Sequence, residues 1–353
     1  MGLAAVILTA SASVMPTVAR AADDLSFMAS MNQSLEWQSN GTTLQQYAIY
    51  GLTPGAEKFF TRLSDIESSK VADAGVYYDG KYYTAVVPTN STYTNYTSTF
   101  AVYDTDTWTR SEIATFGTGN GNIAIDMTVD YTTGTVYAIG TNVYNGSELQ
   151  LKKVDLATGE MTRIGALGAN IMAIAADANG QLWGVGTPMG NISVSNLYKI
   201  DKNTGAYTYV DHLDIKLYTG SLMSMTFDLR DGKLYLVAQT YTENSNQERT
   251  WLNALFTVDT ATAKTTEVRR FEYMEILAGL ALRDCHPKAP RAPEDLKFLF
   301  DSGSTTSGKI SCTMPTLAYD GSQISGQLRI EVSVDGQTVA TAEGLTKSEA
   351  KRS

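Results

Sequence analysis

A short two-stranded unit recurs along the chain and limits what it can fold into. Each copy consists of an apolar strand, an Asp, a polar turn and a second strand, and the copies occupy 151–159, 197–205, 255–263 and, in degenerate form, 100–107. The Asp carboxylate accepts hydrogen bonds from the backbone two residues on, and Gly159 and Gly205 tolerate positive φ. The unit therefore predicts tight hairpins between short antiparallel strands.

A second strand pair precedes each of these hairpins. The pairs span 125–140, 172–186 and 223–238, with a shorter version at 74–87, and each contains an Asp- or Asn-Gly or Thr-Gly turn. Each complete unit thus has four strands, A to D, and the units recur about every 50 residues, which is typical of β-propeller blades. The sequence predicts an all-β fold.

The two ends of this repeat region complement each other. Residues 25–66 contain three predicted strands, 27–31, 46–50 and 58–63, whereas 275–282 has the character of an A strand with no B, C or D strand after it. We therefore expect the C-terminal A strand to pair with the first three strands and to close the ring. The prediction is a five-bladed β-propeller over residues 22–284.

The composition changes after the repeats. Pro287, Pro290 and Pro293 indicate a stiff linker over 285–294. Apolar alternation resumes in 295–353, where Asp335-Gly336 predicts a two-residue hairpin turn. This segment looks like an incomplete fibronectin type III (Fn3)-like module, a partial β-sandwich, because a full sandwich needs about 100 residues. We expect the chain to continue beyond its last residue.

The chain has two cysteines: Cys285 begins the linker, and Cys312 lies in the Fn3-like segment, where its alternation with apolar neighbours suggests a buried position. A disulfide between them would link the propeller to the module in an oxidising compartment, although spacing alone does not fix the pairing.

The N-terminal 21 residues predict export. Residues 2–18 are small and apolar, and they end at Ala19-Arg20-Ala21, which has the form of a signal-peptide cleavage site. The alternative is an N-terminal membrane anchor. With residues 1–21 removed, we expect a secreted or cell-surface protein whose mature chain has no transmembrane segment.

The charge distribution restricts the partners. The net charge is -10, and no Lys/Arg cluster occurs. Binding to nucleic acid or to an anionic membrane surface depends on basic patches, so neither is an expected partner.

The blade pattern over residues 24–284 resembles the broad group of secreted bacterial propellers with YVTN-like or NHL-like repeats. A propeller followed by an Fn3-like module also resembles multidomain surface or secreted proteins of Gram-negative anaerobes. The resemblance implies the fold and leaves the activity open, because such propellers include both binding proteins and enzymes.

Unequal connections give the main functional hypothesis. The B–C connections are long, and they share one face of the ring with the D–A connections. Loops on a rigid scaffold often carry binding residues, and aromatic side chains among amides and hydroxyls suit a glycan or an extracellular protein. The simpler interpretation of these loops is a solvated polar surface. The candidate ligand-binding residues are Trp37, Tyr93, Tyr96, Tyr144, Tyr241 and Trp251.

An enzyme is the alternative function. Asp73, Asp126 and Glu275 each stand near the start of an A strand, and five-bladed propellers include glycosidases that use such acids. The two histidines, His212 and His286, lie in different modules, and no His/Cys group has zinc spacing. No metal site and no cofactor are expected. A third hypothesis is a structural spacer in a larger surface protein.

Overall fold

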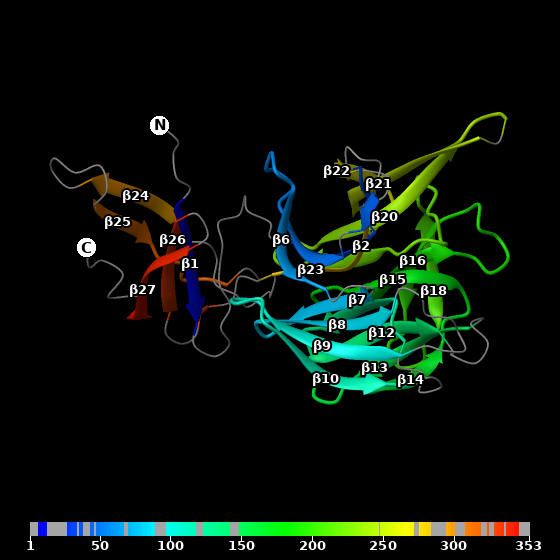
Figure 1. Cartoon of the computed structure of the whole chain (residues 1–353), viewed down its shortest axis with the longest axis horizontal. Helices are drawn as coiled ribbons and strands as arrows, with labels where there is room; N and C mark the ends of the chain where they lie inside the picture. The colour runs from blue at the N-terminus through cyan, green and yellow to red at the C-terminus, as the bar shows by residue number, and fades with distance from the viewer. Residues whose placement is uncertain are drawn as a thin grey trace. The chain divides into compact units, whose positions relative to one another are not determined.

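The computed structural model of the chain contains two compact units, one of residues 26–283 and one formed by residues 1–25 together with 284–353 (Figure 1). Within the described ranges every regular element is a β-strand, and no helix there is long and apolar enough to cross a membrane. The structure describes residues 6–12, 27–33, 35–37, 43–45, 47–66, 70–88, 97–117, 123–141, 148–246, 248–271, 275–283, 294–300, 308–318, 323–324, 328–334 and 337–345.

The larger unit is a five-bladed β-propeller. Each blade is a four-stranded antiparallel sheet, and in four of them the strands follow one another along the chain. The first blade consists, from the innermost strand outward, of β7 (Lys70–Tyr78), β8 (Lys81–Pro88), β9 (Ser98–Asp104) and β10 (Arg110–Phe116), and the second of β11 (Asp126–Asp130), β12 (Thr135–Thr141), β13 (Leu149–Val154) and β14 (Met161–Ala166). The third consists of β15 (Asn170–Ala176), β16 (Leu182–Thr187), β17 (Asn196–Ile200) and β18 (Tyr207–His212). The fourth consists of β19 (Ser224–Asp228), β20 (Lys233–Glu243), β21 (Arg249–Val258) and β22 (Thr265–Phe271).

The fifth sheet, the mixed blade, takes strands from both ends of this unit. Its order is β23 (Ile276–Leu282), β2 (Phe27–Gln33), β5 (Ala48–Leu52) and β6 (Phe60–Asp65). In the pairing of β23 with β2, Phe27 lies opposite Leu282 and Met31 lies opposite Leu277. The connection between β2 and β5 also contains a small hairpin of β3 (Leu35–Trp37) and β4 (Thr43–Gln45).

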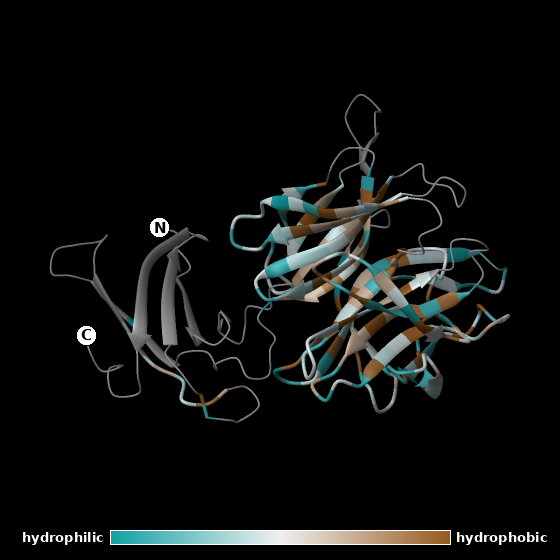
Figure 2. Ribbon diagram, turned by 90° about the horizontal axis from the view of Figure 1, so that it is seen from below, coloured by the Kyte–Doolittle hydropathy of each residue, from teal (hydrophilic) through white to brown (hydrophobic). Residues whose placement is uncertain are grey.

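The inner strands surround a common axis, and burial falls from the inside outward. Each of β7, β11, β15, β19 and β23 contacts the next, and β23 also contacts β7. All five residues of β11 are buried, whereas five of the six residues of the outermost strand β18 are exposed. Figure 2 shows apolar positions along the strands of this unit and hydrophilic positions at many of its turns.

The hydrophobic core lies between neighbouring blades. One cluster joins Tyr137 and Leu151 of the β11–β14 blade to Ile171 and Tyr198 of the β15–β18 blade. Another joins Ile49 of the mixed blade to residues of the β7–β10 blade. Both faces of a blade therefore have to be covered, which only neighbouring blades can do.

The turns use the chemistry that the repeat predicts. Oδ1 of Asp201 accepts a hydrogen bond from the Asn203 N–H (2.7 Å), and Gly205 has φ of 76°. Asp259 makes the same turn with Ala261 (2.8 Å), although Ala263 replaces the glycine and has φ of 53°. The N–H of Thr262, followed by that of Ala261, lowers the pKa of Asp259 by hydrogen bonding to its carboxylate.

The smaller unit contains five described strands. β24 (Glu294–Phe300) pairs with β25 (Gly308–Thr313), and β26 (Leu328–Val334) pairs with β27 (Gln337–Leu345). β1 (Val6–Ala12) lies antiparallel to β26 in the same sheet. The Fn3-like assignment, the linker and the signal peptide remain predictions. The Asp335-Gly336 turn lies outside the described residues.

One predicted loop is a strand extension instead. The sequence predicts a long B–C loop in every blade, but in the β19–β22 blade β20 continues to Glu243 and β21 begins at Arg249. Tyr241 lies opposite Trp251 in the ladder. Cross-strand aromatic pairs stabilise a sheet, which accounts for the extension of the hairpin through this polar stretch.

Polar contacts join the mixed blade to the β7–β10 blade. The Tyr82 hydroxyl donates a hydrogen bond to the Gly279 carbonyl (2.7 Å). Ser30 Oγ donates to the carbonyl of Ala72 on β7 (2.5 Å), and the Arg283 guanidinium contacts the Asp106 carboxylate (2.6 Å). The first and last parts of the propeller are therefore connected by hydrogen bonds and an ion pair.

Gly75→Ala is predicted to destabilise the seam, that is, the contact between the mixed blade and the β7–β10 blade. A Cβ at Gly75 would overlap the hydroxyl and ring atoms of Tyr82, so we expect a loss of about 1–3 kcal/mol, the usual cost of overpacking. Denaturant unfolding would measure it. Gly55→Ala is the control, because a Cβ there meets no atom within 4 Å. Equal stability of the two variants would contradict the assigned position of Tyr82.

Candidate functional site

The face that carries the B–C and D–A connections contains the best-defined aromatic cluster. The rings of Tyr218 and Trp251 meet edge to face with centroids 4.7 Å apart, and Tyr241 lies 5.5 Å from Trp251. The guanidinium carbon of Arg249 lies 4.6 Å from the Tyr241 ring centroid, and Lys216 Nζ lies 5.8 Å from it. This aromatic cluster thus combines three rings with two cations.

Hydrogen bonds fix the D–A connection 213–223 against its neighbours. The Leu213 N–H donates to the Ser195 carbonyl (2.9 Å), and the Leu217 N–H donates to Ser195 Oγ (2.8 Å). On the other side, the Tyr218 N–H donates to the Gln239 carbonyl (2.9 Å). The segment therefore connects the β16–β17 loop to the β20–β21 hairpin and holds Tyr218 in place.

The same face exposes apolar side chains that the sequence analysis did not select. Met189 is 64% exposed and Ile192 is 59% exposed in the β16–β17 loop, and Tyr218 is 36% exposed. Met189 precedes Gly190, which has φ of 76° in a turn. A bulky apolar residue beside a Gly-Asn turn was the available sequence signal, because turns lie at the surface.

The six predicted ligand residues are only partly covered by the structure. Tyr93, Tyr96 and Tyr144 lie outside the described residues, and Trp37 is the last residue of β3, for which only the backbone is described. Tyr241 and Trp251 come together in the aromatic cluster. Tyr241 is only 5% exposed and supports the cluster from beneath, whereas Trp251 is half-buried.

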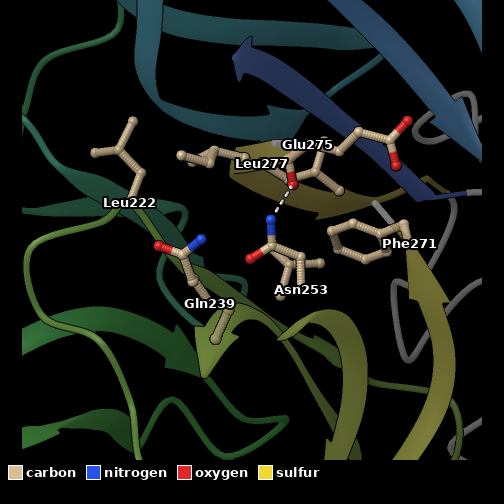
Figure 3. A pocket seen from close by; sticks show the side chains of 9 residues that line it. Leu222, Gln239, Asn253, Phe271, Glu275 and Leu277 are labelled. Carbon is tan, nitrogen blue, oxygen red and sulfur yellow. Dashed lines mark hydrogen bonds between the residues drawn. The ribbon is translucent and has the colours of Figure 1, made fainter. Parts of the chain in front are cut away.

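A small crevice lies next to this cluster, between the β19–β22 blade and β23. Its space between atoms, about 170 Å³, includes open solvent and has no room for a water-sized sphere, so the crevice is much smaller than the 300–1,000 Å³ typical of ligand pockets. Figure 3 shows the Gln239 and Asn253 amides in it, with the Asn253 Nδ2 donating to the Glu275 carbonyl (3.0 Å). The lining residues are Leu222, Val237, Ala238, Gln239, Asn253, Phe271, Glu275, Ile276 and Leu277.

Glu275, one of the three candidate acids, lines this crevice mainly through its backbone. Its carboxylate points away from the two amides in Figure 3. The chain can therefore present this acid to solvent, but the crevice beside it is too small for a sugar ring to enter beside the carboxylate.

Asp126, the second candidate acid, lies inside the propeller instead of at an open mouth. Its side chain is fully buried. Oδ2 accepts a hydrogen bond from the Ile174 N–H (2.8 Å), and Oδ1 accepts one from Ser224 Oγ (2.6 Å). Burial raises the pKa of Asp126 well above its ordinary value, against the opposing effect of these hydrogen bonds.

Asp73, the third candidate acid, combines partial exposure with a perturbed ionisation. It is half-buried on β7, at a break in the pairing register between Ala72 and Ala74. A β-bulge of this kind redirects a side chain from the regular alternation. Burial raises the pKa of Asp73 to about 7, which is within the range of a general acid or base.

The described residues include no metal-binding group. No three or more His, Cys, Asp or Glu side chains come together there. His212 Nδ1 instead contacts the Asn196 side-chain oxygen at 2.7 Å. Cys312 is half-buried, and burial raises the pKa of its thiol; Cys285 lies outside the described residues, so their disulfide remains a prediction.

Comparison with known proteins adds no family. No family model and no curated protein matches the sequence. Among solved structures, the periplasmic gluconolactonase PpgL of Pseudomonas aeruginosa is 12% identical with a TM-score of 0.38, covering 90% of this chain and 96% of that chain. A protein of unknown function from Dyadobacter fermentans is 11% identical with a TM-score of 0.43, and the match covers 71% of this chain and 87% of that chain. An α-L-arabinanase of Cellvibrio cellulosa is 12% identical with a TM-score of 0.37, and the match covers 64% of this chain and 90% of that chain. Similarities this low carry no inference about activity.

Asp73→Asn is predicted to change the pH dependence of stability. The pKa of Asp73 is higher in the folded state than in the unfolded state. Its contribution to the free energy of unfolding is therefore present at about pH 4 and below, and it is lost as the pH rises through about 7. The variant should match the wild type near pH ~4 and exceed it near pH ~8. Denaturant unfolding at both values would test this. Asp211→Asn, at an exposed position on β18, is the control. A difference that is independent of pH would contradict the prediction.

Proposed function

We propose that this chain is a binding protein that recognises a glycan or an extracellular protein through the face carrying its B–C and D–A connections. The aromatic cluster of Tyr218, Tyr241 and Trp251 is the observation that carries this proposal. Its outer ring, Tyr218, is exposed and packs edge to face against Trp251, and the Tyr218 N–H donates to the Gln239 carbonyl. Rigid aromatic groups contribute large contact area at a low entropic cost.

The neighbouring surface extends this recognition area. Met189 and Ile192 project from the loop that Ser195 ties to the same segment. Met, aromatic and Arg side chains are enriched in protein interfaces, and aromatic rings next to amides suit sugars. Since the crevice is small, we infer that a ligand binds across the face and does not enter a deep pocket.

A carbohydrate-active enzyme is the second candidate, and Asp73 is the observation that favours it. This carboxyl is half-buried and has a pKa of about 7, as a general acid requires. A glycosidase also needs a second carboxyl about 5–9 Å away. Asp126 is fully buried inside the propeller, so it is a weaker candidate than Asp73 for a carboxyl that contacts substrate.

We also propose that the chain is exported. The apolar N-terminal segment and the Ala19-Arg20-Ala21 site support removal of residues 1–21, and a secreted or surface location suits a protein with a ligand-binding face. The Fn3-like module after the linker would then position the propeller.

Tryptophan fluorescence of residues 22–353 would test the binding function. Titration with a panel of glycans and matrix proteins should give saturable quenching by at least one member, because Trp251 belongs to the cluster. Tyr218→Ala should weaken that binding about tenfold, the equivalent of one lost aromatic contact. Trp37→Ala tests the contribution of the β3–β4 hairpin on the neighbouring mixed blade.

The matched control is Tyr207→Ala. Tyr207 is 41% exposed but begins β18, next to a short C–D turn on the opposite face. Its removal should leave the affinity unchanged. Absence of quenching by every panel member would contradict the binding proposal, whereas turnover of a glycan that Asp73→Asn abolishes would favour the enzyme.

We further infer that β23 closes the ring. Its pairing with β2 and its contact with β7 support this role, and six of its seven residues are buried. A chain ending at Phe271 should therefore lose cooperative thermal unfolding, whereas a chain ending at Arg283 should keep it. Circular dichroism would monitor the unfolding. Identical unfolding curves of the two chains would be inconsistent with closure by this strand.

A further inference from the structure

The carboxyl of Asp126 and the hydroxyl of Ser224 together connect four of the five inner strands. Asp126 lies on β11 and accepts hydrogen bonds from the Ile174 N–H of β15 and from Ser224 Oγ of β19. Ser224 Oγ in turn accepts a hydrogen bond from the Leu280 N–H of β23 (2.7 Å). Both side chains are fully buried, so no bulk water replaces these contacts. The network is therefore a polar link through the axis of the propeller.

The surroundings of Asp126 contain no compensating cation among the described residues. β15, β19 and β23 place uncharged groups against it: Ile174, Met225, Ser224 and Leu280. From the β7–β10 blade, Tyr82 is the titratable neighbour, and its hydroxyl donates to Gly279 of β23. Asp73 is the acid on β7, the other strand that contacts β11.

Asp130, on the same strand, provides an internal comparison. It is also fully buried, but Lys202 Nζ of the next blade lies 2.6 Å from its Oδ2. Burial acts to raise the pKa of Asp130, yet the hydrogen bonds from Lys202 and Thr132 outweigh it and lower that pKa. Asp126 receives no such ion pair, and burial dominates its ionisation.

We propose that Asp126 is a proton-dependent lock on the propeller axis, which holds the inner strands while neutral and weakens their association when it ionises. A neutral carboxyl can be buried at low cost if it is hydrogen-bonded, whereas an unpaired buried carboxylate is strongly destabilising. The unfolded chain releases this proton at a lower pH than the folded chain. The contribution of Asp126 to the free energy of unfolding is therefore complete below the unfolded-state pKa, and it is lost as the pH rises toward the folded-state pKa.

Asp126→Asn tests the lock, because Asn is isosteric with the neutral acid. Its oxygen can accept from the Ile174 N–H. Its amide, like the hydroxyl of the neutral acid, donates to Ser224 Oγ once the Ser224 proton has turned away from the bond that it donates to Oδ1. Denaturant unfolding of the full chain would be compared from about pH 4 to about pH 8. The ratio of the unfolding constants of wild type and variant should rise up to tenfold per pH unit within this window. Asp73→Asn in the background of both chains removes the separate contribution of Asp73.

Asp130→Asn is the matched control with the opposite sign. Asp130 stabilises the fold as a paired carboxylate, so its contribution to stability is complete above the unfolded-state pKa and is lost as the pH falls through the folded-state pKa. The destabilisation by Asp130→Asn should therefore stay constant from about pH 4 to about pH 8 and should decrease only at lower pH. Parallel pH profiles of Asp126→Asn and Asp130→Asn would overturn the proposal.

A measurement on the unmutated side chain keeps the test independent of how well the variant folds. Carbon-13 NMR of aspartate-labelled protein should contain, besides that of Asp73, one carboxyl resonance that stays in the protonated position at a pH well above the range in which the other aspartates ionise. Loss of this resonance in Asp126→Asn would support the assignment. If every remaining carboxyl is already ionised at about pH 5, the lock does not exist.

Discussion

Contact between the faces of adjacent blades is the constraint on which the rest of the structure depends. The apolar clusters join residues of neighbouring sheets, so a blade at the end of a row would leave a buried face uncovered. The closed ring that we propose would cover both faces of every blade, and the mixed blade combines β2, β5 and β6 with β23. The tight turns, the buried inner strands and the polar seam at Tyr82 and Arg283 serve this arrangement.

Much of this fold could be predicted because its determinants are local and repeated. Asp201 and Gly205 mark a turn whose hydrogen bonds span two residues, and the same chemistry returns about every 50 residues. The β20–β21 extension was missed for the opposite reason. Thr, Asn and Glu around Tyr241 look like a loop, and only the pairing of Tyr241 with Trp251 across the hairpin makes them a ladder.

The candidate site was less predictable, because its properties arise from distant partners. Asp126 and Asp130 are two similar acids on one strand, yet their chemistry depends on Ser224 and Lys202, which are 98 and 72 residues away. Tyr241 was selected as a ligand-binding residue; the structure places its ring beside Trp251 and leaves it only 5% exposed. Tyr218, which is more exposed, lies in a D–A connection that its sequence does not distinguish. Together these positions describe a propeller whose inner strands carry buried, hydrogen-bonded acids and whose proposed recognition surface lies on a face.

The pairing of β2 with β23 also determines how the propeller would respond to tension. Phe27 and Leu282 are opposite each other at one end of this strand pair, close to the points where the chain enters and leaves the larger unit. A pulling force applied through the flanking segments would act on this pair first and open its hydrogen bonds one after another. Strands loaded in this direction yield more readily than strands sheared along their length. The mixed blade is therefore the mechanical weak point of the propeller, and its opening would release the strands at the seam before the other four blades.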